Sequence, residues 1–259
     1  DLGGVRIGFE ICEDAWAADR PGGALAARGV DLILNPSASH FAFGKEEIRR
    51  RLVLEGSRAF AAGYVYANLV GNEAGRAVYD GSVLIAAGGS MLATGRRFSF
   101  ADQSCTAALL DLDSLRPAQA RLAAHAPEQA EDLVTVNFTP PAHDGCPAAV
   151  DGRDAWERGG QVKEEEFSRA VAIGLFDYAR KSRSRGYVVS ASGGADSSAV
   201  ACLVAIAVRL AVEELGVVNA ATRMGLPIPA QSEDAAVAIR RLVVAALTCV
   251  YQSTANSGP

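Results

Sequence analysis

The stretch YVVSASGGADSSAVACLVAIAV, residues 187–208, passes from a short apolar strand through a loop with two adjacent glycines into an apolar helix. Glycines at positions 193 and 194 can turn the backbone so that successive N–H groups point into one concavity, and the following helix adds its positive N-terminal end. This stretch therefore predicts a strand–loop–helix unit of an α/β fold that binds an anion.

The side chains of this loop suit a nucleotide phosphate. Ser192 and Ser197 add hydroxyl donors, and Asp196 could hold a magnesium ion that shields a pyrophosphate leaving group. No lysine follows the glycines, so the loop differs from the G-x-x-x-x-G-K-[ST] loop of kinases and GTPases. The alternative is a Gly-Ser turn that only caps the helix, with Asp196 and Ser197 as ordinary N-terminal residues.

The motif Ser-Gly-Gly-x-Asp-Ser after a strand resembles the pyrophosphate loop of the N-type ATP pyrophosphatases. Members of that family activate a carboxylate or carbonyl as an adenylate and release pyrophosphate. The resemblance implies a Rossmann-like parallel-sheet domain of the adenine nucleotide alpha hydrolase type that uses ATP and Mg²⁺, with Asp196 as a metal ligand. The ATP-binding residues that it implies are Ser190, Ala191, Ser192, Gly193, Gly194, Ala195, Asp196 and Ser197.

A second motif, GFEICEDAW at residues 8–16, places a cysteine where a buried strand ends and the chain turns into a helix. The thiol of Cys12 is thus expected at the mouth of a pocket, where a helix N-terminus and a nearby cation could stabilise the thiolate. The alternative is that Cys12 is a small buried apolar residue.

ICEDAW resembles the nucleophile elbow of the nitrilase superfamily, and NPSAS at 35–39 resembles its next strand end. In that superfamily a Glu–Lys–Cys triad hydrolyses amides through a thioester, within an αββα sandwich. The resemblance implies that Cys12 is the nucleophile, that the backbone N–H of Glu13 stabilises the oxyanion, and that Ser39 and Lys45 contact glutamine. Lys45 has an alternative role as a solvated residue at a helix start, and His40 could line the pocket or be an ordinary loop residue.

The family's catalytic Glu and Lys precede the nucleophile, whereas only eleven residues precede Cys12 here and none is a lysine. Glu10 and Glu13 are too close to Cys12 in sequence to replace them. The chain also starts without Met and stops at Pro259, directly after a predicted helix. We therefore expect a fragment truncated at both ends, with the remaining triad residues and the deamido-NAD site outside it.

Together the two motifs resemble one family, the glutamine-dependent NAD synthetases, in which a nitrilase-type glutaminase precedes an ATP-pyrophosphatase domain. The resemblance implies glutamine hydrolysis, ATP-dependent amidation of deamido-NAD through an adenylate, and a homo-oligomer in the parent protein. Two alternatives stay open: another ATP-dependent amidotransferase, and a nucleotide-binding fragment that lacks complete active sites.

Hydrophobic periodicity and turn signals divide the chain into a partial glutaminase domain at 1–116, a connector at 117–163 rich in Pro, Ala, Asp and Gly, and a partial synthetase domain at 164–259. We expect residues 217–230 to form loop and strand. The predicted strands are 5–11, 31–35, 64–69, 82–86, 90–94, 106–112 and 187–189, and the predicted helices are 24–28, 46–62, 167–182, 198–212 and 233–251.

Composition excludes several classes of partner. Of the 259 residues 49% are hydrophobic and 21% charged, and the net charge of −5 provides no basic footprint for nucleic acid. The basic cluster at 180–185 fits a solvated helix end better than a phosphate contact. Five dispersed cysteines without metal-ligand spacing predict no zinc or haem, and the absence of a signal peptide or an apolar run of transmembrane length predicts a cytoplasmic protein without membrane contact.

Overall fold

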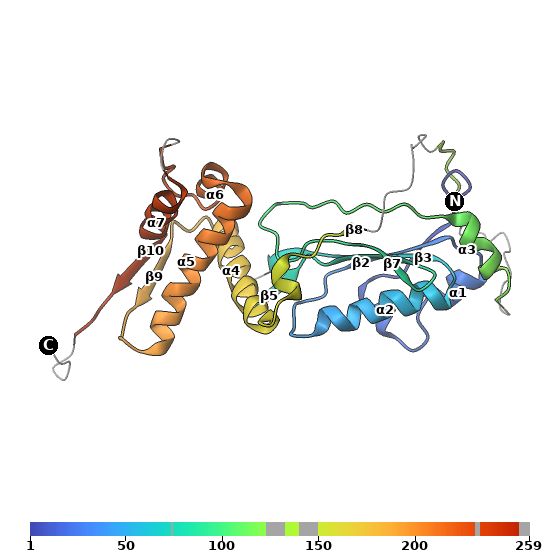
Figure 1. The fold of residues 1–259 in the computed structure, drawn as a ribbon, viewed down its shortest axis with the longest axis horizontal. Helices are drawn as coiled ribbons and strands as arrows, with labels where there is room; N and C mark the ends of the chain where they lie inside the picture. Colours follow the sequence, from blue (N-terminus) through green and yellow to red (C-terminus); the bar gives the residue numbers. More distant parts are fainter. Residues whose placement is uncertain (74, 123–132, 140–149, 231–233, 254–259) are drawn as a thin grey trace. The chain divides into compact units, whose positions relative to one another are not determined.

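The computed structural model describes residues 1–73, 75–122, 133–139, 150–230 and 234–253 (Figure 1). The chain forms two compact units. The first comprises Asp1–Val70, Tyr79–Arg97 and Ser104–Glu157, and the second comprises Gly71–Val78, Phe98–Gln103 and Arg158–Pro259. The predicted division at 1–116, 117–163 and 164–259 stays a prediction. Two short segments of the predicted first domain, Gly71–Val78 and Phe98–Gln103, belong to the second unit.

The first unit is built on a six-stranded sheet in the order β1-β2-β3-β6-β7-β8. Strands β1, β2 and β3 are parallel, β6 and β7 run antiparallel to their predecessors, and β8 pairs parallel with β7. Parallel neighbours need a crossover, and the helices α1 and α2 provide it. The strands are β1 (Ile7–Phe9), β2 (Leu32–Ser37), β3 (Gly63–Asn68), β6 (Val83–Ala87), β7 (Ser90–Thr94) and β8 (Val150–Asp151).

Helix α2 covers this sheet (Figure 1) and packs on it through Leu52 and Val53. The facing side chains of the sheet, including Ile33, Tyr64 and Leu84, are almost fully buried, so the core lies between α2 and the middle of the sheet. The remaining elements of the unit are the 3₁₀ helix η1 (Cys12–Trp16), α1 (Gly22–Ala27), α2 (Lys45–Ala59), α3 (Leu112–Gln119) and the 3₁₀ helix η2 (Ala155–Arg158), whose last residue lies in the second unit.

The second unit packs helices around the apolar helix α5, with α4 and α5 lying side by side (Figure 1). Its two strands β9 and β10 are parallel, with Tyr187 opposite Leu247 and Ser190 opposite Val250. The elements are α4 (Val162–Ser182), β9 (Tyr187–Ser190), α5 (Ala195–Leu215), α6 (Val217–Arg223), α7 (Ala235–Ala246) and β10 (Leu247–Val250).

Strands β4 (Val70–Glu73) and β5 (Ala77–Asp80) pair with each other, and Gly71–Val78 belongs to the second unit. There the carboxylate of Asp177 accepts hydrogen bonds from the backbone N–H of Asn72 at 2.7 Å and from Arg180 at 2.5 Å. Burial alone would raise the pKa of Asp177, but the bonds from Lys181, Asn72 and Arg180 hold it below its usual value. The carboxylate therefore ties this hairpin to α4.

The α/β class and most predicted elements of the first unit agree with the structure, but four expectations were wrong. Residues 106–112 form no strand, because Asp111 caps α3 through the N–H groups of residues 113 and 114. Residues 217–223 form helix α6 instead of loop and strand. The helix predicted over 233–251 ends at Ala246, because residues 247–250 pair with β9.

The fourth error concerns membrane-length apolar runs. Helix α5 is long and apolar enough to span a bilayer on length and composition. A core helix of a water-soluble domain meets the same two criteria, and α5 supplies Val204, Ala207 and Val208 to the core of its unit. The helix by itself is therefore weak evidence for a membrane protein.

A buried carboxylate joins β1 to the rest of the first unit. Glu10 is fully buried and accepts bonds from Arg20 at 2.9 and 2.5 Å, from the hydroxyl of Tyr64 at 2.5 Å and from the N–H of Gly22 at 2.9 Å. Burial opposes ionisation, but the bonds from Arg20 and Tyr64 outweigh it and hold the pKa of Glu10 below its usual value. Both carboxylate oxygens of Glu10 thus accept hydrogen bonds from groups of the protein itself.

We predict that Glu10→Gln lowers the free energy of unfolding at pH 7 by about 3 kcal/mol, because it leaves the Arg20 cation without its carboxylate. The folded pKa of Glu10 lies below the ordinary 4.5, so its contribution is present above that pH and is lost as pH falls through the folded pKa. Urea titrations at pH 7 and pH 3 should therefore show a difference that shrinks on acidification. Glu47→Gln, at an exposed ion pair on α2, is the matched control and should change stability little at both pH values. An equal loss at both pH values would contradict the ionic role of Glu10.

Candidate active site

The ends of the three parallel strands of the first unit bring the predicted glutaminase residues together. Cys12 follows β1, Ser39 follows β2, and Asn68 ends β3, where it is in register with Ser37. Carboxyl ends of parallel strands meet at one edge of a sheet, which is the usual place for a binding site in α/β folds. A cavity of about 360 Å³ lies there, lined by Cys12, Glu13, Trp16, Ala38, Ser39, His40, Lys45 and Ile48.

Cys12 stands at a sharp turn between β1 and η1. Its φ of +50° is uncommon for a residue other than glycine, and the turn is held by the carboxylate of Asp14, which accepts from the N–H of Ile11 at 3.1 Å. The Cys12 thiol is half-buried and faces the cavity. Such a turn presents a side chain at the mouth of a pocket, where a nucleophile can reach a substrate.

Lys45 supplies a positive charge to the same cavity from the first residue of α2. Its ammonium group donates to the carbonyl of His40 at 3.1 Å. Burial and the neighbouring Arg49 lower the pKa of Lys45, while Asp80 and Cys12 partly offset this. Lys45 and Cys12 thus line the same cavity, and a role of Lys45 toward a substrate stays a prediction.

Ser39 is held rigidly at the cavity wall. It is buried, its N–H donates to the side-chain carbonyl of Asn68 at 2.9 Å, and its own carbonyl accepts from the Asn68 amide at 2.9 Å. Glu13 also lines the cavity, with its side chain exposed. The structure thus gathers Cys12, Glu13, Ser39 and Lys45 at one pocket, and adds His40 as a lining residue.

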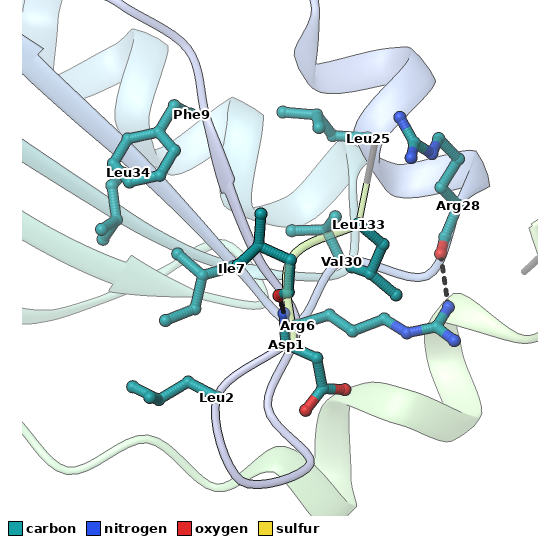
Figure 2. Close-up of a pocket in the computed structure, with 11 residues that line it drawn as sticks. Asp1, Leu2, Arg6, Ile7, Phe9, Leu25, Arg28, Val30, Leu34 and Leu133 are labelled. Atoms are coloured by element: carbon teal, nitrogen blue, oxygen red, sulfur yellow. Dashed lines mark hydrogen bonds between the residues drawn. The ribbon is translucent and has the colours of Figure 1, made fainter. Parts of the chain in front are cut away.

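A larger cavity of about 450 Å³ opens elsewhere on the first unit (Figure 2). Its wall is mainly apolar side chains of β1, α1 and β2, such as Phe9, Leu25 and Leu34, and its polar edge includes Arg6, which donates to the carbonyl of Arg28 at 2.8 Å. The described residues that line it include no cysteine, serine, histidine or lysine, so the smaller cavity is the candidate active site.

The second predicted site lies in the second unit, at the junction of β9 and α5. Gly193 has a φ of +77°, and a Cβ placed there would meet open space, so the glycine is required by backbone conformation and not by crowding. The side chain of Ser192 accepts from the N–H of Gly194 and lies 3.3 Å from the hydroxyl of Ser197. The loop and the first turn of α5 are mostly exposed and open to a ligand.

Asp196 lies in the first turn of α5, beside these hydroxyls, and its side chain is exposed. Among the described residues, no group of three or more His, Cys, Asp or Glu side chains could hold a metal. One carboxylate still suits Mg²⁺, which usually keeps several waters and binds one or two carboxylates together with substrate phosphates. Asp196 is the one carboxylate among residues 190–197, and it is open to solvent.

A comparison with protein-family models finds no match for this chain. The glutamine-dependent NAD(+) synthetase of Macaca fascicularis is 35% identical over 202 residues, which are 76% of this chain and 28% of that protein. The crystal structure of a glutamine-dependent NAD(+) synthetase from Cytophaga hutchinsonii has a TM-score of 0.70 and 38% identity over 97% of this chain and 34% of that one. By sequence and by fold, the chain is a relative of the glutamine-dependent NAD(+) synthetases. The resemblance predicted from the sequence is thereby confirmed.

The chain spans about a third or less of the length of these relatives. The glutamine-dependent NAD+ synthetase of Acinetobacter baumannii, solved with adenosine diphosphate, also shares the fold, with a TM-score of 0.57 at 18% identity over 96% of this chain and 39% of that one. The α/β class expected from the sequence agrees with these NAD synthetase folds.

Three polar residues behind the pocket wall were missed by sequence reasoning. Arg49, Asn68 and Asp80 form a hydrogen-bonded group next to Ser39. Asn68 falls inside the predicted strand 64–69, and Asp80 lies just before the predicted strand 82–86. Arg49 gave one usable signal, since it lies among the apolar positions of α2, next to Ile48 and near Val53, where a charge is out of place.

We predict that Lys45→Met slows alkylation of Cys12 by iodoacetamide at pH 7.5 by about threefold or more, because a nearby cation stabilises the reactive thiolate. Peptide mass mapping would follow Cys12, with the exposed Cys202 as an internal reference. Arg51→Met removes a charge from the exposed face of α2 and should leave the rate unchanged. Equal alkylation rates in wild type and Lys45→Met would contradict the prediction that Lys45 stabilises the Cys12 thiolate.

Proposed function

We propose that the protein is a glutamine-hydrolysing NAD⁺ synthetase, a carbon–nitrogen ligase that converts deamido-NAD to NAD⁺ with ATP and with ammonia from glutamine. The observation that carries the proposal is the presence in one chain of two sites at strand-to-helix junctions. One presents a thiol, a serine and a lysine, and the other presents an open Gly-Gly loop at a helix N-terminus. Relatives that match 76% and 97% of this chain bear that name.

In the proposed glutaminase reaction, the Cys12 thiolate attacks the side-chain amide carbon of glutamine. The proton lost by the thiol goes to the amide nitrogen, the C–N bond breaks and ammonia leaves. Water then hydrolyses the thioester to glutamate and restores the thiol. The backbone N–H of Glu13 is the proposed donor to the developing oxyanion. Lys45 is suited to the α-carboxylate of the substrate by charge, and Ser39 adds a fixed polar wall. Glu10 is excluded as the general base, because Arg20, Tyr64 and Gly22 occupy its carboxylate.

In the proposed synthetase reaction, the nicotinate carboxylate of deamido-NAD attacks the α-phosphorus of ATP, and pyrophosphate leaves. Ammonia then attacks the mixed anhydride and displaces AMP, which is a far better leaving group than oxide. Residues 190–197 provide backbone N–H groups, two hydroxyls and the positive end of α5 for the phosphates. A magnesium ion held at Asp196 would supply charge neutralisation on the pyrophosphate oxygens. The bound adenosine diphosphate of the Acinetobacter relative supports the nucleotide part of the proposal.

The proposal includes small-molecule substrates as the partners of the chain, a homo-oligomeric parent protein and a cytoplasmic location. The net charge of −5 supports the absence of a nucleic-acid partner, and dispersed free cysteines support a reducing compartment. Size-exclusion chromatography with light scattering of the full-length protein tests the oligomer directly.

We expect Cys12→Ala in the full-length protein to lower glutamine-driven NAD⁺ formation by at least about 10³-fold, because the nucleophile is lost. Ammonia-driven formation should be unchanged, since that reaction needs only the synthetase site. Cys105→Ala, at an exposed cysteine of the same unit, is the matched control and should retain both activities. Retained glutamine-driven turnover in Cys12→Ala would reject the assignment.

Asp196→Asn should lower NAD⁺ formation with either nitrogen source by about tenfold to a hundredfold, because a neutral amide holds Mg²⁺ more weakly than a carboxylate and the pyrophosphate then lacks its counter-charge. Glutamine hydrolysis by Cys12 does not require this carboxylate. Asp234→Asn, which keeps a capping side chain at the start of α7, is the control and should be neutral. Normal rates with both nitrogen sources in Asp196→Asn would refute the metal role.

A further inference from the structure

A buried ion pair lies directly behind the candidate glutamine pocket. The guanidinium of Arg49 is fully buried and donates from Nη1 to Oδ2 of Asp80 at 2.5 Å, and Asp80 is itself only 1% exposed. The pair connects α2 to the end of β5, two elements far apart in the sequence. Asp80 is fixed in turn by the amide of Asn68, which donates to its Oδ1 at 2.7 Å.

The other end of the Arg49 guanidinium holds the pocket wall. Nη2 donates to the carbonyl of Ser39 at 2.8 Å, to the Ser39 hydroxyl at 3.2 Å and to the carbonyl of His40 at 3.3 Å. Lys45 donates to the same His40 carbonyl at 3.1 Å, and it lies one helical turn before Arg49 on α2. A single buried cation therefore sets the positions of the serine and of the loop to which the substrate-facing lysine is bonded.

Fold stability alone gives little reason for this arrangement. Burying a guanidinium and a carboxylate carries a desolvation penalty that the pair's attraction often fails to repay, and apolar residues of similar volume are frequently as stable or more so. The Arg49 side chain also keeps a buried Nε with no hydrogen-bond partner, while its guanidinium lies 5.8 Å from the Tyr66 ring centroid. The unfavourable desolvation of the Arg49 guanidinium is therefore better explained by a need for its planar, forked arrangement of N–H donors.

We propose that Arg49, held by Asp80, is a positioning residue that fixes Ser39 and the His40 carbonyl in the geometry that binds the amino-acid end of the amide substrate. It acts through the pocket wall and touches no reacting atom. The inference rests on the proposed glutaminase function, and it assigns substrate affinity to a pair of residues outside the cavity. Arginine is specifically needed, because a lysine donates from a single nitrogen and lacks the planar fork that bridges Asp80 on one side to Ser39 and His40 on the other.

The test uses the full-length protein and separates substrate binding from chemistry. Arg49→Lys should raise the KM for glutamine about tenfold and change kcat less than about threefold. The double variant Arg49→Met/Asp80→Asn removes both charges of this ion pair, so neither partner is left buried without the other and the melting temperature should approach that of wild type. Its KM for glutamine should stay raised, because the bridge to Ser39 is still missing. Arg51→Lys, on the exposed face of the same helix, should keep wild-type values.

Ammonia-driven NAD⁺ formation should be unaffected in every variant. A double variant with restored stability and a wild-type KM would overturn the inference, as would an unchanged KM in Arg49→Lys. Unfolding of both Arg49 variants would assign the pair to fold stability and overturn it as well. Absence of glutaminase activity in the wild-type protein would instead reject the proposed function, so the two failures are distinguishable.

Discussion

The parallel pairing of β1, β2 and β3 is the constraint on which the candidate active site depends. It aligns Phe9 with Leu34 and Ser37 with Asn68, so three chain segments leave the sheet at the same edge. Hydrogen bonding between strands therefore determines where Cys12 and Ser39 meet, although they are 27 positions apart in sequence. The helices that connect parallel strands then deliver Lys45 to the same edge, because α2 begins just after the loop that follows β2.

The same physical arrangement occurs in the second unit with different chemistry. Strand β9 ends at a loop that leads into α5, and here the backbone itself provides the binding groups, assisted by a glycine at positive φ. In the first unit the corresponding turn carries a cysteine at positive φ, which presents a side chain. A strand-to-helix turn can thus present a nucleophilic side chain, where a cysteine has the positive φ, or bind an anion through backbone N–H groups, where a glycine has it.

Features that depend on neighbouring residues in the sequence were predictable, and features that depend on contacts between distant segments were not. Cys12, Ser39 and the Gly193–Gly194 loop follow apolar strands, and strand ends can be read from hydrophobic runs and turn residues. The residues 106–112 have a strand-like composition, but no neighbouring strand pairs with them, and Asp111 starts a helix instead. Residues 247–250 become a strand only because β9 lies beside them. Arg49 and Asp80 were missed because a buried ion pair between distant segments leaves no periodic pattern in either of them.

The central claim is that the cavity at the ends of β1 and β2 is an amide-substrate site with Cys12 as its nucleophile. An electrophilic diazo-ketone analogue of glutamine, incubated with the full-length protein and followed by peptide mass mapping, tests it most directly. The account predicts one adduct, on the peptide that contains Cys12, and protection by excess glutamine. Labelling of Cys105, Cys202 or Cys249 in its place, or an adduct on Cys12 that glutamine does not prevent, would contradict it.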